Sequence, residues 1–413
     1  MSAYSKRERA IASLLARFPT LKSYLKRIYT NVFYALYKPD FDYKIKQTFV
    51  LREVDSSSGD TFFGYYDKSP ESSDGRYILF QRASGGTVRS PKFTADVEVV
   101  VVDRESKQEV ISLKSRAFNW QQGTKLQWLS NECFIFNDYE NGEYVSRIVD
   151  LEVGKVVDTL PLPIYDTFVG ESEYALTTSF ERLSIFAPDY GYFAKVLDNN
   201  LKYSCDGVYW ISLKTGDYKQ IVSLEQLSAF EFNNSLGVVH TVNHIMISPS
   251  GKQFIFIHRW YIDGQRFDRL LLSDLAGNLR VLADDGMVSH CCWADDHNVT
   301  GFFRHNSENN YFNIDLKTSS ISPYSQSEYT DGHPTVNGSV ILTDTYPNRK
   351  GLQELMFLDE GGRKNILGEF KHSPRYFGES RCDLHPRLSC VGNRIYFDSV
   401  CTGIRKLYYL EKQ

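Results

Sequence analysis

The sequence predicts an all-β fold, a seven-bladed β-propeller preceded by an N-terminal amphipathic helical extension. The main observation is a unit of strand, turn and strand, followed by a third strand that ends in an Asp-x-x-x-Gly-like turn, which returns about every 50 residues. Such a repeat, built of strands and turns alone, is typical of a propeller with one four-stranded blade per unit. The third strands form seven similar segments: VEVVVVDRESKQ, SRIVDLEVGK, VYWISLKTGD, RLLLSDLAGN, YFNIDLKTSS, LMFLDEGGRK and KLYYLEKQ.

The first two strands of six units form similar hairpins: YYDKSPESSDGRYILFQRA (65–83), GTKLQWLSNECFIFNDYE (123–140), NHIMISPSGKQFIFIHRW (243–260), SHCCWADDHNVTGFFRH (289–305), GHPTVNGSVILTDTY (332–346) and LHPRLSCVGNRIYFDS (384–399). The third unit is irregular, because ALTTSFERLSIFAPDYGYF carries an insertion before its last strands. The seventh unit stops after its third strand at Gln413. We therefore expect QTFVLREV (47–54) to supply the missing outer strand and close the ring, so that residues 47–413 form one propeller domain.

Residues 1–46 differ in kind and form the predicted extension. Apolar residues recur there at spacings of three and four, which predicts an amphipathic helix over about 20–37: Leu21, Tyr24, Leu25, Ile28, Val32, Phe33 and Leu36. This segment holds ten Lys and Arg against three Asp and Glu. Its apolar face either packs on the propeller or a second protomer, or lies on an anionic membrane surface.

Composition narrows the class of protein. The 413 residues are 42% hydrophobic and 24% charged, as expected for a globular chain, and the net charge of −4 gives no nucleic-acid footprint. The seven cysteines are scattered without CxxC spacing, which argues against a disulfide framework or a zinc site and for a reducing compartment. With no secretory signal and no apolar run long enough to span a bilayer, the predicted location is the cytoplasm, with membrane association through the extension left open.

Basic residues and histidines recur at one position of the repeat. Aligning the units on their turns places six polar residues at the start of the innermost strand: Lys68, Lys125, His244, His290, His333 and His385. In a propeller this position lies at the channel mouth. The second strands end at the same face: Gln81-Arg82, Asn137-Asp138, His258-Arg259, Arg304-His305, Asp344-Thr345-Tyr346 and Asp398-Ser399. We therefore predict a binding site at the mouth of the channel.

Four imidazoles from successive blades favour a bound divalent cation, because such ions take three or four His nitrogens around an open position. The alternative is that each His only hydrogen-bonds the neighbouring backbone. Asp331 and Asp383 each stand two residues before one of these histidines, which indicates carboxylates that orient His333 and His385.

The motifs HIMISPSGKQFIFIHR, DGHPTVNGSVILTDTY and DLHPRLSCVGNRIYFDS resemble those of the oligogalacturonate lyase family, and the serial histidines make the likeness specific. GYYDKSP and WQQGTKLQW resemble proteins of bacterial capsule and O-antigen clusters, often loosely labelled glycosyltransferases. The resemblance covers roughly residues 60–413. It implies a Mn²⁺-like ion, held by His and in one blade by Gln, and cleavage of uronate-containing oligosaccharides by β-elimination.

The resemblance also implies roles for individual residues. His290, His333 and His385 would be metal ligands, and His244 a ligand or the residue that handles the proton. Arg182, in the third unit, would lie near the substrate carboxylate. No residue matches the Gln ligand, which leaves the coordination number open.

Chemistry adds further candidates. A base must remove the C5 proton of the uronate, for which Tyr66, Lys68, His244 and Tyr346 are the candidates. Cationic and polar side chains near the mouth would bind the substrate: Arg259, Arg387, Arg304 and Gln122.

The predicted function is thus a metal-dependent polysaccharide lyase acting on an acidic bacterial surface glycan. A glycoside hydrolase would need paired carboxylates, and no obvious pair exists among the acids at the predicted mouth: Asp67, Asp138, Asp344 and Glu379. A glycosyltransferase would need a nucleotide-sugar site, and no Gly-rich phosphate loop precedes a helix. A non-catalytic propeller scaffold for polysaccharide assembly is the remaining alternative.

Overall fold

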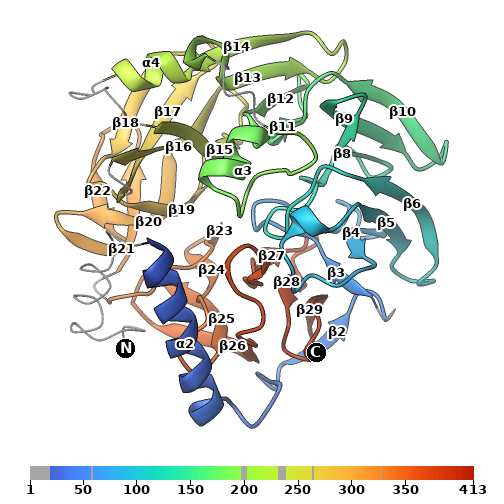
Figure 1. Ribbon diagram of the computed structural model, residues 1–413, viewed down its shortest axis with the longest axis vertical. Coiled ribbons are helices and arrows are strands. Elements are labelled where there is room, and N and C mark those ends of the chain that lie inside the picture. The colour runs from blue at the N-terminus through green and yellow to red at the C-terminus, as the bar shows by residue number, and fades with distance from the viewer. Residues whose placement is uncertain (1–18, 57–58, 197–201, 231–238, 263–264, 326) are drawn as a thin grey trace.

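Seven antiparallel sheets stand around a central axis in the computed structural model, which confirms the seven-bladed β-propeller (Figure 1). The structure describes residues 19–413 except 57–58, 197–201, 231–238, 263–264 and 326. Blades are numbered here in chain order from residue 60, and their strands follow one another outward from the axis.

The first four blades each contain four strands. Blade 1 holds β3 (Asp60–Phe62), β4 (Tyr77–Ala83), β5 (Val97–Asp103) and β6 (Glu109–Ser115). Blade 2 holds β7 (Gln127–Trp128), β8 (Cys133–Glu140), β9 (Glu143–Asp150) and β10 (Lys155–Leu160). Blade 3 holds β11 (Asp166–Phe168), β12 (Tyr174–Thr177), β13 (Gly207–Ser212) and β14 (Tyr218–Ser223). Blade 4 holds β15 (Val239–Ile247), β16 (Gln253–Ile262), β17 (Gln265–Asp274) and β18 (Leu279–Ala283).

The last three blades complete the ring. Blade 5 holds β19 (Val288–Trp293), β20 (Asn298–His305), β21 (Glu308–Asp315) and β22 (Ile321–Pro323). Blade 6 holds β23 (Thr335–Asn337), β24 (Val340–Asp344), β25 (Leu352–Asp359), β26 (Lys364–Lys371) and, as a fifth strand, β1 (Tyr43–Ile45). Blade 7 holds β27 (Arg387–Leu388), β28 (Arg394–Ser399), β29 (Lys406–Lys412) and β2 (Phe49–Glu53).

The predicted ring closure is confirmed. Strand β2 pairs with β29 from Phe49 opposite Lys412 to Glu53 opposite Tyr408, so the N-terminal strand covers the outer edge of the last blade. Strand β1 adds itself to the edge of blade 6, which the sequence did not predict, because three residues are too few to show an alternating pattern. The propeller therefore begins at Tyr43, inside the range assigned to the extension.

The short helices lie in the connections between strands. They are α3 (Phe180–Phe186) and α4 (Leu224–Ala229), together with the 3₁₀ turns η2 (Pro91–Phe93), η3 (Tyr203–Cys205) and η4 (Gly378–Ser380). Helix α3 belongs to the insertion of the third unit. The side chain of Ser179 caps it by accepting a hydrogen bond from the N–H of Arg182, at a distance of 3.0 Å.

Polar residues at the ends of four second strands join each blade to the next. In each case the side chain accepts a hydrogen bond from a backbone N–H at the start of the following blade, as seen for Gln81, Asn137, Asp344 and Asp398. These residues were predicted to lie at the binding mouth. Their side chains link neighbouring blades, and Asp344 in addition contacts His333 of its own blade.

The predicted N-terminal helix is present as α2 (Pro19–Tyr37) and lies over blade 6 on the face seen in Figure 1. Its contact with the propeller is aromatic. The ring of Tyr34 closes on Gly351, where a Cβ would come within 2.6 Å of it, and the guanidinium of Arg349 lies 5.6 Å from the Phe33 centroid. The propeller does not bury the aliphatic face, whose residues are 41–68% exposed: Leu25, Ile28, Val32 and Leu36. Contact of this face with a second protomer or a membrane stays a prediction.

The expectations for the cysteines and for membrane-spanning segments can be compared with the structure. All seven cysteines lie in the described part of the chain and are unpaired. Among the described helices, none combines the length and the hydropathy that crossing a bilayer requires.

Candidate functional site

The aligned position has an unusual backbone in three blades, just before the innermost strand at Lys125 and His385 and at a register shift within β15 at His244. Lys125, His244 and His385 have φ values of 55°, 56° and 47°, a left-handed conformation that costs energy for residues with a Cβ. Such strain persists where surrounding contacts fix it, and it concentrates at functional sites. One such contact is the N–H of His244, which donates to the Tyr165 hydroxyl at 3.0 Å. The shared conformation supports the alignment of these three positions.

The four predicted imidazoles converge. The ring centroids of His290 and His333, and of His333 and His385, are 4.2 Å apart, and those of His244 and His290 are 5.2 Å apart. The ring of Tyr65 lies 5.2–6.4 Å from all four. Residues from four blades therefore form an arc around a tyrosine of blade 1, as their equivalent positions predicted.

Asp344 holds two of these histidines. Its Oδ1 accepts hydrogen bonds from the backbone N–H of His333 and from Nδ1 of the same ring, both at 2.8 Å, and its Oδ2 accepts the N–H of His385 at 3.1 Å. Burial would lower the pKa of His333, but the Asp344 carboxylate outweighs it and raises that pKa. With Nδ1 engaged, Nε2 is the atom of His333 left to ligate a cation.

The expected orienting role of Asp331 toward His333 is not what the structure shows. Its Oδ1 lies 3.5 Å from Nδ1 of His290, and its Oδ2 accepts a hydrogen bond of 2.6 Å from Ser289, which also contacts His290. Burial and the neighbouring His333 nonetheless lower the pKa of His290.

His244 differs from the other three. It is buried, and neither ring nitrogen finds a hydrogen-bond partner within the described residues. Burial, together with the nearby His290 and Arg259, holds the pKa of His244 well below its usual value. The imidazole is therefore neutral at pH 7 and keeps a free lone pair.

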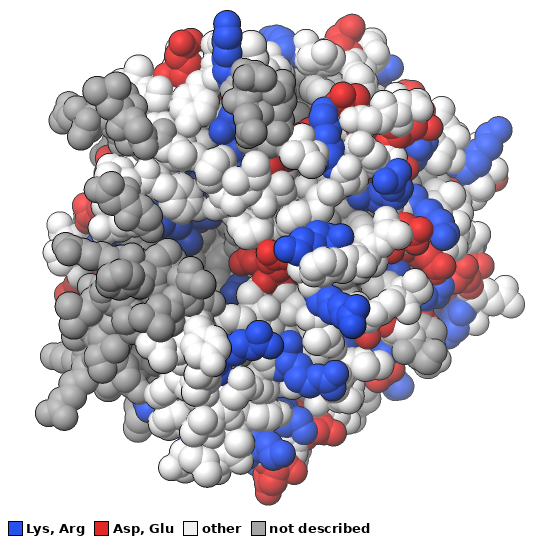
Figure 2. Space-filling model, viewed as in Figure 1, with Lys and Arg blue, Asp and Glu red and all other residues white. Residues whose placement is uncertain are grey.

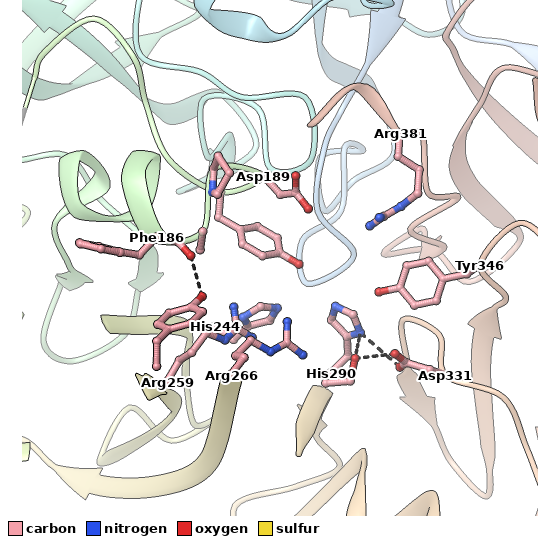
Figure 3. Close-up of a pocket in the computed structure, with 14 residues that line it drawn as sticks. Phe186, Asp189, His244, Arg259, Arg266, His290, Asp331, Tyr346 and Arg381 are labelled. Atoms are coloured by element: carbon pink, nitrogen blue, oxygen red, sulfur yellow. Dashed lines mark hydrogen bonds and ion pairs between the residues drawn. The ribbon is translucent and has the colours of Figure 1, made fainter. Parts of the chain in front are cut away.

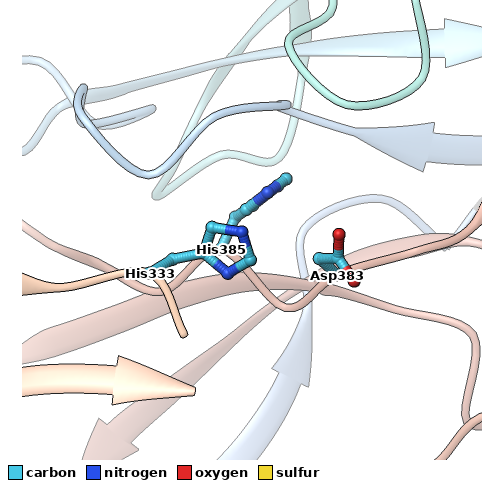
Figure 4. A group of neighbouring side chains, drawn as sticks. All are labelled: His333, Asp383 and His385. Carbon is cyan, nitrogen blue, oxygen red and sulfur yellow. The ribbon is translucent and has the colours of Figure 1, made fainter. Parts of the chain in front are cut away.

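A close group of potential metal ligands consists of His333, Asp383 and His385, which Figure 4 shows side by side. One donor atom from each lies within 4.8 Å of the others. The Arg381 guanidinium grips Asp383, with Nε–Oδ1 of 2.8 Å and Nη2–Oδ2 of 2.7 Å, and keeps the pKa of that carboxyl low despite its burial.

Two imidazoles and a carboxylate are a donor set that suits Mn²⁺, Fe²⁺ or Zn²⁺. Burial depresses the pKa of His385, so its ring is neutral and able to ligate. The residues present therefore fit a divalent cation. The group includes two of the four predicted histidine ligands, leaves out His244 and His290, and adds Asp383, which the sequence analysis cast as an orienting residue.

A cavity of about 330 Å³ adjoins this group and is lined by His244 and His290 (Figure 3). The guanidinium of Arg381 also lines it and connects it to Asp383. The ring of Tyr346, another lining residue, lies 5.5 Å from that of His333. Figure 2 shows acidic side chains beside the hollow near the middle of this face, with basic ones around them.

Two arginines on one side of the cavity share a single carboxylate. Arg259 donates to Oδ1 of the buried Asp268 at 2.5 Å, and Arg266 lies 3.2 Å from Oδ2 of the same residue. One negative charge does not balance two guanidinium groups, so this wall is suited to an anionic ligand. This agrees with the substrate-binding role predicted for Arg259.

The opposite wall comes from the loop after α3. Asp189 and Tyr190 line the cavity there, and burial raises the pKa of the Asp189 carboxyl and that of Tyr190, the latter to about 12. Burial likewise raises the pKa of Tyr346, so both tyrosine hydroxyls remain protonated at neutral pH. Sequence reasoning missed Asp189, Tyr190, Arg266 and Arg381. The one signal for the first two was the irregular insertion of the third unit, since functional residues concentrate in such loops.

Two predicted bases are already engaged elsewhere. Lys68 forms an ion pair with Asp166, and the hydroxyl of Tyr66 donates to the carbonyl of Cys291 at 2.8 Å. Lys125 is buried, which lowers its pKa, and its Nζ lies 3.4 Å from Asp67. These side chains support the channel but do not line the cavity.

Two predicted substrate-binding arginines have protein partners and do not line the cavity. Arg182 is buried and pairs with Asp206, so it faces away from the cavity lining. Arg387 donates to the carbonyl of Tyr65 and to Asp398, each at 2.7 Å, and thereby fixes the loop that carries Tyr65. Burial of a guanidinium is tolerated only with such partners, and the partners occupy its carboxylate-binding edge.

The other two predicted substrate-binding residues also lie outside the cavity lining. Gln122 is buried and donates to the hydroxyl of Tyr165 at 2.8 Å. Arg304 donates to the side chain of Asn309 on the neighbouring strand at 3.0 Å. His258, next to Arg259, points to the other face of β16 and contacts His240 at 2.9 Å.

No protein-family model and no curated protein sequence matches the chain. Among solved structures, an oligogalacturonate lyase in complex with manganese aligns over 91% of this chain and 97% of its own, with a TM-score of 0.63 and 15% identity. An oligogalacturonate lyase from Vibrio parahaemolyticus aligns over 91% of this chain and 98% of its own, with a TM-score of 0.40 and 11% identity. A puromycin-hydrolyzing peptidase from Mycobacterium tuberculosis covers 81% of this chain and 52% of its own, at a TM-score of 0.48 and 11% identity. At 15% identity, the likeness to the manganese complex establishes a shared fold, and the activity has to be argued from the site.

Proposed function

We propose that this protein is a metal-dependent polysaccharide lyase that cleaves a uronate-containing glycan by β-elimination. The observation that carries the proposal is the group formed by His333, Asp383 and His385, next to a cavity walled by Arg259 and Arg266. A cation site and unbalanced guanidinium groups together suit a substrate that bears a carboxylate. The manganese in the complex of the structurally similar lyase supports Mn²⁺ as the cation.

The reaction requires removal of a weakly acidic C5 proton. A cation bound to the three-residue group would supply Lewis-acid stabilisation of the charge that develops on the substrate carboxylate. The guanidinium of Arg259, held in place by Asp268, would orient that carboxylate from the other side. His244 would take the C5 proton, because its ring is neutral, lines the cavity and has an unused nitrogen.

As the C5 proton leaves, its electron pair forms the C4–C5 double bond and the bond from C4 to the glycosidic oxygen breaks. The departing oxygen then needs a proton. The hydroxyls of Tyr190 and Tyr346 line the same cavity and stay protonated, so either is placed to donate it. Tyr346 thereby keeps its predicted catalytic role, as an acid and not as a base.

One observation favours a second candidate, a glycoside hydrolase. Asp189 and Asp331 both line the cavity, and burial raises the pKa of the Asp189 carboxyl, as a general acid requires. A lyase and a hydrolase differ in their products. Both create a reducing end, but only the lyase creates an unsaturated uronate that absorbs in the ultraviolet.

The test is incubation of the protein with acidic glycans and Mn²⁺, followed by measurement of ultraviolet absorbance and of reducing ends. Both signals should rise together, and a chelator should abolish both. Reducing ends without absorbance would assign the hydrolase, and neither signal on any acidic glycan would favour the non-catalytic scaffold. A place in a capsule or O-antigen pathway and a cytoplasmic location stay predictions from the sequence.

A further inference from the structure

A second, larger cavity continues from the candidate site. It measures about 710 Å³ and shares three lining residues with the first cavity: Asp331, Tyr346 and Arg381. From these residues it extends under helix α2, whose Thr30 and Tyr34 form one wall. The two cavities therefore lie next to each other, and a chain molecule bound in the first has the second beside it.

The charges of the two cavities differ. Both are lined by Asp331 and Arg381, but the first adds the guanidinium pair of Arg259 and Arg266 together with the Asp189 carboxyl. The second has carboxylates at Asp331 and Glu354, and the Arg381 guanidinium at its inner end is bound to Asp383. Its histidine, His372, is neutral, because burial lowers its pKa to about 3. Lys364, an exposed residue, is the other cation among the lining residues.

The second cavity offers what an uncharged sugar needs. Tyr34 and Phe377, which are half-buried, line it with aromatic residues, and rings of this kind pack against the apolar faces of pyranoses. The carboxylate of Glu354, which lines the second cavity and not the first, can accept hydrogen bonds from sugar hydroxyls, but it repels a further carboxylate.

We propose that the second cavity is a subsite for a neutral, hydroxyl-rich sugar, so that the substrate is a heteroglycan in which uronates alternate with uncharged units. This inference rests on the proposed function, because it takes the first cavity as the uronate site. It also gives the N-terminal extension a role, since Tyr34 of α2 completes the wall of the subsite.

The test is calorimetric titration of the full chain, in Mn²⁺, with two tetrasaccharides of known composition. One is a hyaluronan tetrasaccharide, in which uronate alternates with a neutral N-acetylhexosamine, and the other is tetragalacturonate. We expect the alternating probe to bind more tightly, by on the order of tenfold. Glu354→Gln should reduce the difference in affinity between the two tetrasaccharides, because tetragalacturonate should bind this variant more tightly.

Two tyrosines of α2 provide a matched pair of variants. Tyr34→Ala should weaken binding of the alternating tetrasaccharide by about tenfold, while Tyr24→Ala, at a position that is 64% exposed and away from the cavity, should leave it unchanged. Binding of digalacturonate, the probe for the first cavity, should respond to neither variant. Thermal unfolding of both variants controls for loss of fold.

The outcomes separate this inference from the proposed function. If digalacturonate binds and Arg259→Gln abolishes that binding, the assignment of the first cavity as the uronate site is supported. Equal affinity for the two tetrasaccharides, or an unchanged affinity in Tyr34→Ala, would then overturn the neutral subsite alone. If none of the uronate probes binds the wild-type chain, both the function and the subsite are overturned.

Discussion

Replacing Asp344 by Asn should separate metal binding from folding. The carboxylate accepts hydrogen bonds at both oxygens, on the His333 side at 2.8 Å and on the His385 side at 3.1 Å. An amide offers one acceptor oxygen, so one of the two histidines would face an NH₂ group. Loss of such an outer partner typically lowers metal affinity about 10–100-fold. The free energy of unfolding should fall by about 1–3 kcal/mol, as for other buried hydrogen bonds to a charged group.

The assay is titration of the metal-free protein with Mn²⁺ by calorimetry, together with urea unfolding of each variant. Asp398→Asn is the matched control. Asp398 ends the equivalent strand of blade 7, is equally buried, and accepts backbone hydrogen bonds from Phe63 and Gly64 at 3.0 and 3.1 Å. Because Asp398 also binds the buried Arg387 guanidinium at 2.7 Å, this variant should lose at least as much stability as Asp344→Asn but keep its Mn²⁺ affinity. Unchanged affinity in Asp344→Asn, or equal loss in both variants, would refute the reasoning.

Four further predictions follow from the same structure. Removing residues 1–54 takes away β2 and should lower the melting temperature far more than removing residues 1–41, which keeps both edge strands; equal melting temperatures would contradict the closure. His244→Gln should reduce elimination about 10²–10⁴-fold with its Mn²⁺ content unchanged, and loss of the metal would instead assign that ring as a ligand. Because burial lowers the pKa of His240 to about 4 and that of His372 to about 3 from 6.5, the unfolded chain binds protons that the folded chain does not. Urea titrations should therefore show stability lost as the pH falls below about 6.5, by up to about 1.4 kcal/mol per pH unit for each ring, whereas a flat profile would show that these rings ionise freely. The exposed strip of α2 and the basic excess of residues 1–46 favour an anionic membrane, so the chain should co-sediment with phosphatidylserine vesicles in low salt and Leu25→Asp should prevent it; a wild-type chain that stays in solution contradicts this.

The N-terminal helix shows how far local pattern reaches. Its position could be predicted, because apolar spacing of three and four is a property of the segment alone. The face of the helix that packs against the propeller could not be predicted. The contact uses Phe33 and Tyr34, since these rings meet a glycine turn between β24 and β25, and that turn is more than 300 residues away along the chain.

The propeller, its seven blades, its closure by β2 and the equivalence of the four histidines could all be predicted from the sequence alone. All of these features belong to the sequence repeat, and each repeat unit supports the interpretation of the others. The tertiary structure decided the chemistry around them. Asp383 lies beside His333 and His385. Asp189 reaches the cavity from an irregular loop, and Arg387 is bonded to buried partners. These arrangements depend on which non-repeating segments contact one another in the folded chain. A repeat pattern in the sequence does not predict those contacts.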